Sequence, residues 1–332
     1  MYARVFYLVC LLFQLAHGAN FYDRDENILE LTPSNFERVI HRTNYTTLVE
    51  FYAPWCGYCQ EIKGPMKSAA KMLSGLVQVA AVNCDESVNK QLCAQNRVSG
   101  FPTLMVFRPP KIDLDNPKKN SNVASSLHAS EVYKGERKTR PIVDFAVSRV
   151  KNYVRRLNRY SRFEEVFKSA RTQYAVVLVS KKEKIPTVFK SVAIDWLGIY
   201  DFYSVWDQKL KGVSQLDFEN ATTQWPNTIK YLRSLENAET DFESPKILVL
   251  DRKSDTFEEL DLLKTTDKTD IASFLSRFEP KPREGPLSKR HEYIQSVANK
   301  SKSKKTNQNR KAKQGKKHKT KSQPDLPVDD EL

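Results

Sequence analysis

The sequence predicts an α/β protein with two domains and a basic tail. A length of 332 residues suits about two domains. Apolar runs typical of strands alternate with helical periodicities over most of the chain, as α/β folds require. The charge is uneven: residues 281–332 carry 15 Lys/Arg and 6 Asp/Glu, a net +9 out of +14. The remaining residues are only mildly basic, which disfavours a nucleic-acid-binding fold built around a basic face.

Residues 1–18 are predicted to be a secretory signal peptide. An early Arg4 precedes the apolar run Val5–Leu15, and Ala16-His17-Gly18 supplies small outer residues for cleavage after Gly18. The alternative is a buried N-terminal helix. The run is shorter than the roughly 20 residues that span a bilayer, and no other stretch is long and apolar enough, so no membrane segment is expected.

The first domain is predicted over residues 19–152, and its candidate reactive cysteines lie at a strand–helix junction. Thr47–Ala53 is apolar and aromatic with one carboxylate, as in a buried strand. After Pro54-Trp55 a buried helical face follows, with members Cys59, Ile62, Met66, Ala69 and Leu73. This junction places Cys56 at a helix N-terminus, where the helix dipole favours the thiolate and lowers the thiol pKa.

After signal-peptide removal, which takes Cys10, four cysteines remain. In an oxidising compartment an even number predicts two pairs. The spacing of Cys56 and Cys59 suits a reversible redox pair; a zinc site is the alternative, but its second half is lacking. Cys84 and Cys93, nine residues apart, are interpreted as a structural disulfide.

These segments together resemble the catalytic thioredoxin-like domain of the protein disulfide-isomerase family. The resemblance is carried by Glu50–Cys59, Val82–Asp85, Val98–Thr103 and Tyr133–Arg137, in the family's order across residues 28–150. The insert Arg108–Leu114 and the later segment Lys190–Gly198 are similar to a small member of that family, and this likeness covers nearly the whole chain.

The resemblance implies a role for each matched residue. Cys56 attacks a substrate disulfide and Cys59 resolves the mixed disulfide. Trp55, Gly57 and Tyr58 support the active site, and Phe101 with a cis Pro102 pairs with extended substrate. Glu50, on a buried strand with a raised pKa, accepts the Cys59 proton, unless it faces solvent. Arg137 matches an arginine thought to lower the pKa of the buried cysteine, with a solvated surface charge as the alternative.

Three residues depart from the family pattern. Tyr58 replaces a usual His, which removes a potential cation beside the thiolate and predicts a weaker oxidant. Ala81 stands where many relatives have a Lys near the buried Glu, leaving Glu50 more isolated. Pro65 lies one residue later than the usual helix proline, so a bend of uncertain geometry is expected.

The rest of the folded chain contains one insert, one closing helix and a second domain. Residues 109–130 lack periodicity and predict a long surface loop. Residues 141–156 are expected to form the closing helix of the first domain. Over residues 153–280 alternating strands and helices, with Ser244-Pro245 echoing Phe101-Pro102, predict a second thioredoxin-like domain without cysteine. Each domain is then a mixed sheet flanked by helices. A predicted aromatic cluster, either client-binding surface or core, comprises Trp196, Tyr200, Phe202, Tyr203 and Trp206.

The tail at 281–332 is predicted to be disordered, either as a tether for a retention signal, a weak contact for acidic proteins or a plain linker. It ends in Asp329-Asp330-Glu331-Leu332, one residue from the known retrieval signals of the endoplasmic reticulum. With the signal peptide, this ending predicts residence in the lumen and recognition by the retention receptor. Sequons at Asn44, Asn220 and Asn299 are glycosylation candidates.

Two functions follow from this reading. The first is a thiol–disulfide oxidoreductase or isomerase that acts on unfolded or misfolded secretory proteins and needs neither a metal nor a bound cofactor. It would exchange electrons with glutathione or a partner oxidase, with a lectin chaperone as a further possible partner; we expect a monomer that binds no nucleic acid. The second is a redox-independent chaperone or escort that binds unfolded clients.

Overall fold

The computed structural model describes residues 21–23, 25–120, 127–157, 166–169, 171–206, 225–236, 245–262 and 267–279. The predicted signal peptide, the sequons at Asn220 and Asn299, and the tail with its retrieval signal lie outside the described residues. Within these ranges no helix has the length and apolarity needed to cross a membrane. All the elements below belong to one compact unit, residues 1–286.

The first sheet is mixed, with strand order β1-β3-β2-β4-β5. β1 (Leu29–Glu30), β3 (Gln78–Asn83) and β2 (Thr47–Tyr52) run parallel, whereas β4 (Thr103–Arg108) and β5 (Ala129–Val132) are antiparallel to their neighbours. Every residue of β2 and β3 is buried, which fits their largely apolar sequence. The central strand β2 leads directly toward the two cysteines.

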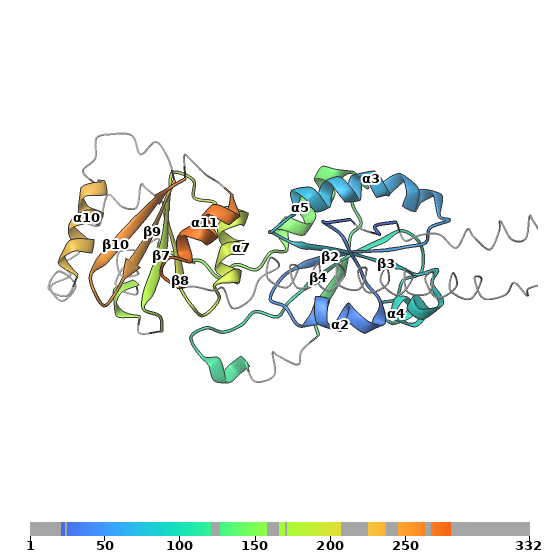
Figure 1. The fold of residues 1–332 in the computed structure, drawn as a ribbon, viewed down its shortest axis with the longest axis horizontal. Coiled ribbons are helices and arrows are strands. Elements are labelled where there is room, and N and C mark those ends of the chain that lie inside the picture. The colour runs from blue at the N-terminus through green and yellow to red at the C-terminus, as the bar shows by residue number, and fades with distance from the viewer. Residues whose placement is uncertain are drawn as a thin grey trace, which may run out of the picture. The chain divides into compact units, whose positions relative to one another are not determined.

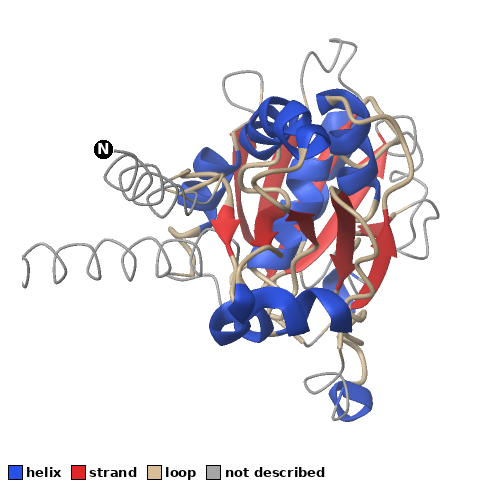
Figure 2. Ribbon diagram, turned by 90° about the vertical axis from the view of Figure 1, so that its right-hand side faces the viewer, coloured by secondary structure: helices blue, strands red, loops and turns tan. Residues whose placement is uncertain are grey.

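Helices cover both faces of this sheet. α3 (Gly57–Met72) and α5 (Thr139–Ser148) lie on one side, and α2 (Pro33–His41) and α4 (Lys90–Gln95) on the other (Figure 1). α3 continues through Pro65, and its buried residues include Cys59, Ile62, Met66 and Ala69, the predicted helical face. The strands therefore form a layer between helices (Figure 2).

The second sheet repeats the strand order of the first. Its order is β10-β9-β7-β8-β6, formed by β10 (Thr256–Asp261), β9 (Lys246–Asp251), β7 (Tyr174–Ser180), β8 (Asp201–Trp206) and β6 (Arg155–Arg156). β6, β8 and β7 are parallel, and β9 and β10 antiparallel, so the two sheets correspond strand by strand. This correspondence confirms the predicted α/β fold with two thioredoxin-like domains.

β7 separates two hydrophobic clusters by its alternation. Val176 and Leu178 belong to the cluster under α7 (Thr187–Asp195) and α11 (Lys268–Leu275). Val177 and Val179 face the other cluster, which includes Ile229 of α10 (Pro226–Glu236). Successive strand residues point to opposite faces, so one apolar run serves both layers.

The predicted aromatic cluster is core rather than client-binding surface. Trp196, Tyr200, Phe202 and Tyr203 are at most 4% exposed, and Trp206 is half-buried. The alternative that these aromatic residues fill a core is therefore confirmed, and the client-binding surface is not present at this position.

The predicted closing helix 141–156 is wrong in its second half. α5 ends at Ser148, and Arg155–Arg156 form β6 of the second sheet. The Asn152 carboxamide oxygen accepts a hydrogen bond from the Val154 amide at 3.0 Å, a local turn that competes with helix. Val150 and Val154, two apolar residues of the predicted helix, are nevertheless buried. The apolar pattern here therefore reflects burial of a non-helical segment.

The insert at 109–130 is only partly the predicted surface loop. Residues 121–126 lie outside the described residues, while Ala129 and Ser130 already belong to β5. Ile112 and Leu114 are partly buried against the main hydrophobic cluster. Asp115 pairs with Arg155 at 2.5 Å and with Arg171 at 2.8 Å, so the insert also contacts the second domain.

A buried lysine joins the two domains. Lys268 Nζ lies 2.6 Å from Asp195 Oδ2 and donates to the Gly75 carbonyl at 2.6 Å and to Ser191 Oγ at 2.7 Å. Gly75 has φ +74, a left-handed conformation that glycine adopts without strain. Tyr45, wholly buried, accepts from the same ammonium at 3.2 Å. The first domain thus supplies acceptors for a cation of the second.

Candidate active site: two thiols above a buried carboxyl

Cys56 and Cys59 occupy the junction that the sequence predicts, with unequal access to solvent. Cys56 is the N-terminal capping residue of α3, and its carbonyl accepts from the Cys59 amide at 3.1 Å. Both side chains are free thiols; Cys56 is half-buried and Cys59 is fully buried. Cys56 Sγ is therefore accessible to an external disulfide, whereas Cys59 Sγ is shielded from it.

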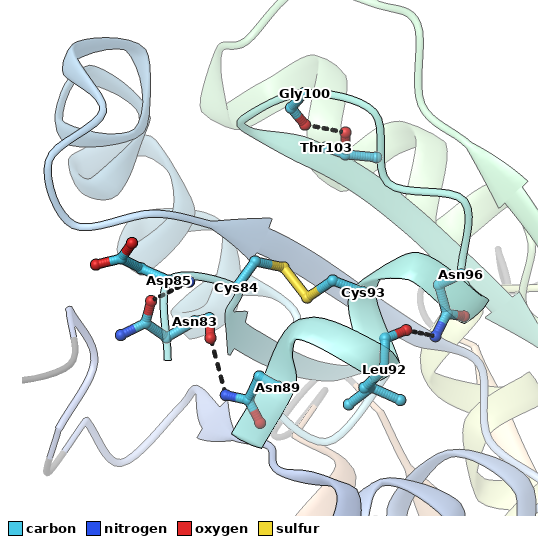
Figure 3. Close-up of a disulfide and its surroundings, with 9 residues drawn as sticks. All are labelled: Asn83, Cys84, Asp85, Asn89, Leu92, Cys93, Asn96, Gly100 and Thr103. Atoms are coloured by element: carbon cyan, nitrogen blue, oxygen red, sulfur yellow. Dashed lines mark hydrogen bonds between the residues drawn. A yellow bond between two sulfur atoms is a disulfide. The ribbon is translucent and has the colours of Figure 1, made fainter. Parts of the chain in front are cut away.

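The loop before β4 lies against Cys56. The Phe101–Pro102 peptide bond is cis, and Cys56 Sγ donates to the Phe101 carbonyl oxygen at 3.6 Å. The Thr103 hydroxyl donates to the Gly100 carbonyl at 2.6 Å and closes the turn (Figure 3). Trp55 and Tyr58, 67% and 65% exposed, provide apolar surface beside the thiol.

Glu50 is fully buried in the middle of β2, so the alternative of a solvent-facing carboxylate is wrong. Its neighbours across the sheet are Ala81 on β3 and Leu104 on β4, neither of which carries a charge. Burial raises the pKa of Glu50 to about 8. Oε2 accepts from the Tyr22 hydroxyl at 2.5 Å, whereas Oε1 has no hydrogen-bond partner among the described residues.

Cys59 stays protonated at neutral pH. Burial raises its pKa to about 12, and the charge of Glu50 adds to the effect. The thiol is the ineffective form of a cysteine in exchange, because the thiolate is the nucleophile. A base close to this sulfur is therefore needed, and Glu50 is the carboxylate whose charge reaches it.

Arg137 is not brought into the core beside Cys59. It is exposed, and its guanidinium carbon lies 5.7 Å from the centre of the Tyr58 ring, a cation–π distance. Its charge still lowers the pKa of Glu50, although less than burial raises it. The structure thus pairs Arg137 with the residue that replaces the family's usual histidine.

Two residues of the site were missed by the sequence reasoning. Tyr22 contacts Glu50 directly, and Glu30, at the end of β1, accepts from the Tyr52 hydroxyl at 2.8 Å. Burial raises the pKa of Glu30 to about 7, so a second carboxyl near Glu50 titrates near neutrality. For Tyr22, the one available signal was the aromatic pair Phe21-Tyr22, which begins three positions beyond the predicted cleavage site.

A disulfide between Cys84 and Cys93 ties the end of β3 to α4 (Figure 3). The Asn89 carboxamide donates to the Asn83 carbonyl at 2.8 Å and orders the intervening turn. Asp85 accepts from the Trp55 indole at 3.0 Å, so this turn also fixes an aromatic side chain of the active site.

Two further predicted features can be located. Asn44 is half-buried, and the hydroxyl of Thr46 in its sequon is buried and donates to the Arg149 carbonyl at 3.0 Å. Among the described residues no group of three or more His, Cys, Asp or Glu side chains could hold a metal ion.

The chain is similar to known proteins, both in its first domain and over most of its length. Residues 27–129 match the thioredoxin family model. The chain is 48% identical over 276 residues to protein disulfide-isomerase MPD1 of Saccharomyces cerevisiae, an alignment that covers 83% of this chain and 86% of that protein. It is 36% identical over 146 residues to protein disulfide-isomerase A6 of Mesocricetus auratus, covering 44% and 29%. The solved structure of full-length ERdj5 matches with 17% identity over 76% of this chain and 33% of that one, at a TM-score of 0.43.

Proposed function

Because this chain belongs to the protein disulfide-isomerase family and is a thiol–disulfide oxidoreductase, we propose that it exchanges disulfides in folding secretory proteins through Cys56 and Cys59. The observation that carries the proposal is a half-buried thiol in contact with a fully buried one at the start of α3, beside a cis-proline loop. That arrangement separates attack from resolution.

The reaction proceeds in two exchanges. The Cys56 thiolate attacks one sulfur of a substrate disulfide, and the other sulfur leaves as a thiolate, which gives a mixed disulfide. Cys59 then loses its proton to Glu50 and attacks Cys56 Sγ. The substrate leaves with both sulfurs reduced, and the enzyme gains a Cys56–Cys59 disulfide. The reverse sequence oxidises a substrate, and attack by the substrate's own thiolate on the mixed disulfide rearranges it.

Substrate affinity comes from the backbone beside Cys56. The cis Phe101–Pro102 loop offers main-chain groups to an extended segment, and Trp55 and Tyr58 offer apolar contact. Neither feature selects a sequence, which suits an enzyme for many unfolded clients.

The proposed compartment is the lumen of the endoplasmic reticulum. The predicted signal peptide and the C-terminal Asp-Asp-Glu-Leu support this location, and glutathione or a partner oxidase supplies the electron acceptor there. Retention would require the receptor to accept Asp329 at the first position of the signal.

The alternative of a redox-independent chaperone lacks support from the second domain, because the aromatic residues proposed as its client-binding surface are buried. The exposed aromatics Trp55 and Tyr58 flank Cys56 and so belong to the exchange site.

Paired cysteine variants test the mechanism. Cys56→Ser should abolish reactivation of a scrambled test protein, whereas Cys59→Ser should accumulate mixed disulfides that mass spectrometry detects. The matched control Cys84→Ser, Cys93→Ser removes two sulfurs outside the pair and should keep the activity. Turnover by Cys56→Ser would contradict the proposal. Equilibration of the wild-type pair with glutathione sets the direction: a potential near −270 mV favours reduction and one near −180 mV favours oxidation and isomerisation.

A further inference from the structure

The segment that opens the described chain reaches the catalytic carboxyl. Tyr22 is 1% exposed, and its hydroxyl donates to Glu50 Oε2 at 2.5 Å. Tyr22, Tyr52 and Cys59 belong to one buried cluster. The contact joins residues 28 positions apart, so it is a product of the fold.

Several contacts fix this segment in place. The Tyr22 amide donates to Glu30 Oε1 at 3.1 Å, and the Tyr52 hydroxyl donates to the same oxygen at 2.8 Å. The Phe21 amide donates to the Tyr52 hydroxyl at 2.9 Å, and the two rings stack at 4.7 Å. Lys63 of α3 places its ammonium 4.7 Å above the Phe21 ring. Residues of β1, β2 and α3 thus hold the Tyr22 hydroxyl on Glu50.

The hydroxyl is a permanent donor. Burial and the neighbouring carboxyls raise the pKa of Tyr22 far above its ordinary value, so it keeps its proton throughout the range in which the enzyme works. It occupies only one oxygen of Glu50, and Oε1 has no partner among the described residues. A carboxylate anchored through one oxygen presents the other in a fixed orientation.

We propose that Tyr22 is a positioning residue of the resolving step, whose hydroxyl stabilises the carboxylate form of Glu50 and orients it to take the Cys59 proton. The proposal rests on the function proposed above for Glu50. It assigns to the active site a residue four positions beyond the predicted signal-peptide cleavage site.

The step balances with glutathione as the leaving group. In the Cys56–glutathione mixed disulfide, the Cys59 S–H bond breaks and its proton passes to Glu50 Oε1. The thiolate attacks Cys56 Sγ, the bond between Cys56 and glutathione breaks, and the glutathione thiolate takes a proton from solvent. Oxidised glutathione supplied the oxidising equivalents when the mixed disulfide formed. A hydrogen bond to the carboxylate favours its charged form, so loss of the Tyr22 hydroxyl leaves Glu50 protonated to a higher pH.

The test follows the two phases separately in the full-length protein. Reduced enzyme is mixed with oxidised glutathione, quenched with acid at intervals, and separated by mass spectrometry into reduced, glutathionylated and internally disulfide-bonded forms. Tyr22→Phe should leave the first phase unchanged and slow the second about tenfold at pH 7, the order expected for one charge-assisted hydrogen bond. The pH midpoint of the second phase should move up by about one unit.

Two further variants make the test specific. The control Tyr200→Phe removes another buried hydroxyl, which donates to the Leu275 carbonyl at 2.7 Å, and should change neither phase. If Tyr22→Phe folds poorly, 3-fluorotyrosine introduced at position 22 by nonsense suppression keeps the ring and strengthens the donor. It should shift the midpoint of the second phase to lower pH.

The outcomes separate this inference from the proposed function. If Glu50→Gln slows the second phase while Tyr22→Phe and the fluorinated residue leave its rate and midpoint unchanged, Tyr22 is structural only and the inference is overturned. If Glu50→Gln itself leaves the second phase unchanged, the proposed role of Glu50 fails.

Discussion

Glu50 is a carboxyl in the core; among the described residues its hydrogen-bond partner is the Tyr22 hydroxyl and it forms no ion pair. The alanine opposite it on β3 and the leucine opposite it on β4 make this environment apolar. The carboxyl is therefore neutral over part of the physiological pH range, and it becomes a base only as the pH approaches its raised pKa of about 8. A residue with that property links catalysis to stability.

We predict that stability falls as pH rises because of Glu50. The unfolded carboxyl titrates near 4.5 and the folded one near 8, so between these values the folded state binds more protons. Raising the pH through this window favours unfolding, by a few kcal/mol in total. Urea unfolding of the reduced protein should show this slope, and Glu50→Gln should reduce it.

The pKa of Glu30 is also raised, so a smaller fall of stability with rising pH should remain in Glu50→Gln. Equal slopes for the wild type and Glu50→Gln would contradict the assignment.

A functional residue can be predicted from the sequence when it lies within a recognisable local pattern. The Cys-x-x-Cys spacing and the apolar strand around Glu50 point to these residues because a neighbouring sequence defines their environment. Tyr22 lacks such a pattern: its partner lies 28 residues away and is reached only through the parallel pairing of β1 with β3 and of β3 with β2.

The disulfide Cys84–Cys93 joins two elements that follow each other in the chain. It closes a short loop between β3 and α4, and Asp85 in this loop accepts a hydrogen bond from Trp55. Closing a loop of nine residues restricts the unfolded chain more than the folded one.

Removal of this disulfide should weaken the fold without ending catalysis. Cys84→Ser, Cys93→Ser is expected to lower the free energy of unfolding by about 2–3 kcal/mol, measured by urea titration against the oxidised wild type. Below the new unfolding midpoint, exchange through Cys56 should proceed. A loss of exchange in the folded variant would show that the turn positions the active site rather than stabilising it.

Prediction succeeds for elements whose pattern has a single structural reading. Thr47–Ala53 is the predicted buried strand, and β2 is observed at Thr47–Tyr52. The prediction of a helix to residue 156 is wrong because Val150 and Val154 are buried by tertiary packing. In this segment the Asn152 side chain accepts a hydrogen bond from the Val154 amide in a turn. Burial alone does not distinguish the two conformations.

The whole molecule contains one sheet design twice, and only the first copy carries thiols. The equivalence follows from the matching order and direction of five strands in each sheet. The sequence predicts the second fold only through the alternation of strands and helices, because β10 has no buried residue and lacks the apolar run that marks β7.

We predict that Lys268 couples the stability of the two domains. Lys268→Met removes the cation beside the buried Asp195 and the donor to Gly75, and should cost about 3–5 kcal/mol in urea unfolding followed by circular dichroism. The control Lys246→Met breaks a more exposed pair with Glu259 and should cost less than about 1 kcal/mol.

The double variant Lys268→Met, Asp195→Leu should recover most of the loss, because neither charge is then left alone. Wild-type stability in Lys268→Met alone would contradict the coupling.

The placement of Trp55 has a consequence for optical work on the whole protein. Its indole N–H bonds to the residue after Cys84, and its ring meets Phe101 beside Cys56, at 6.2 Å between ring centres. Its fluorescence therefore responds to both cysteine pairs, while Trp196 emits from the core of the second domain. A change in Trp55 emission during oxidation therefore combines the effects of two cysteine pairs, on top of the emission of the other three tryptophans. The Cys84→Ser, Cys93→Ser background is needed to assign the change to the catalytic pair.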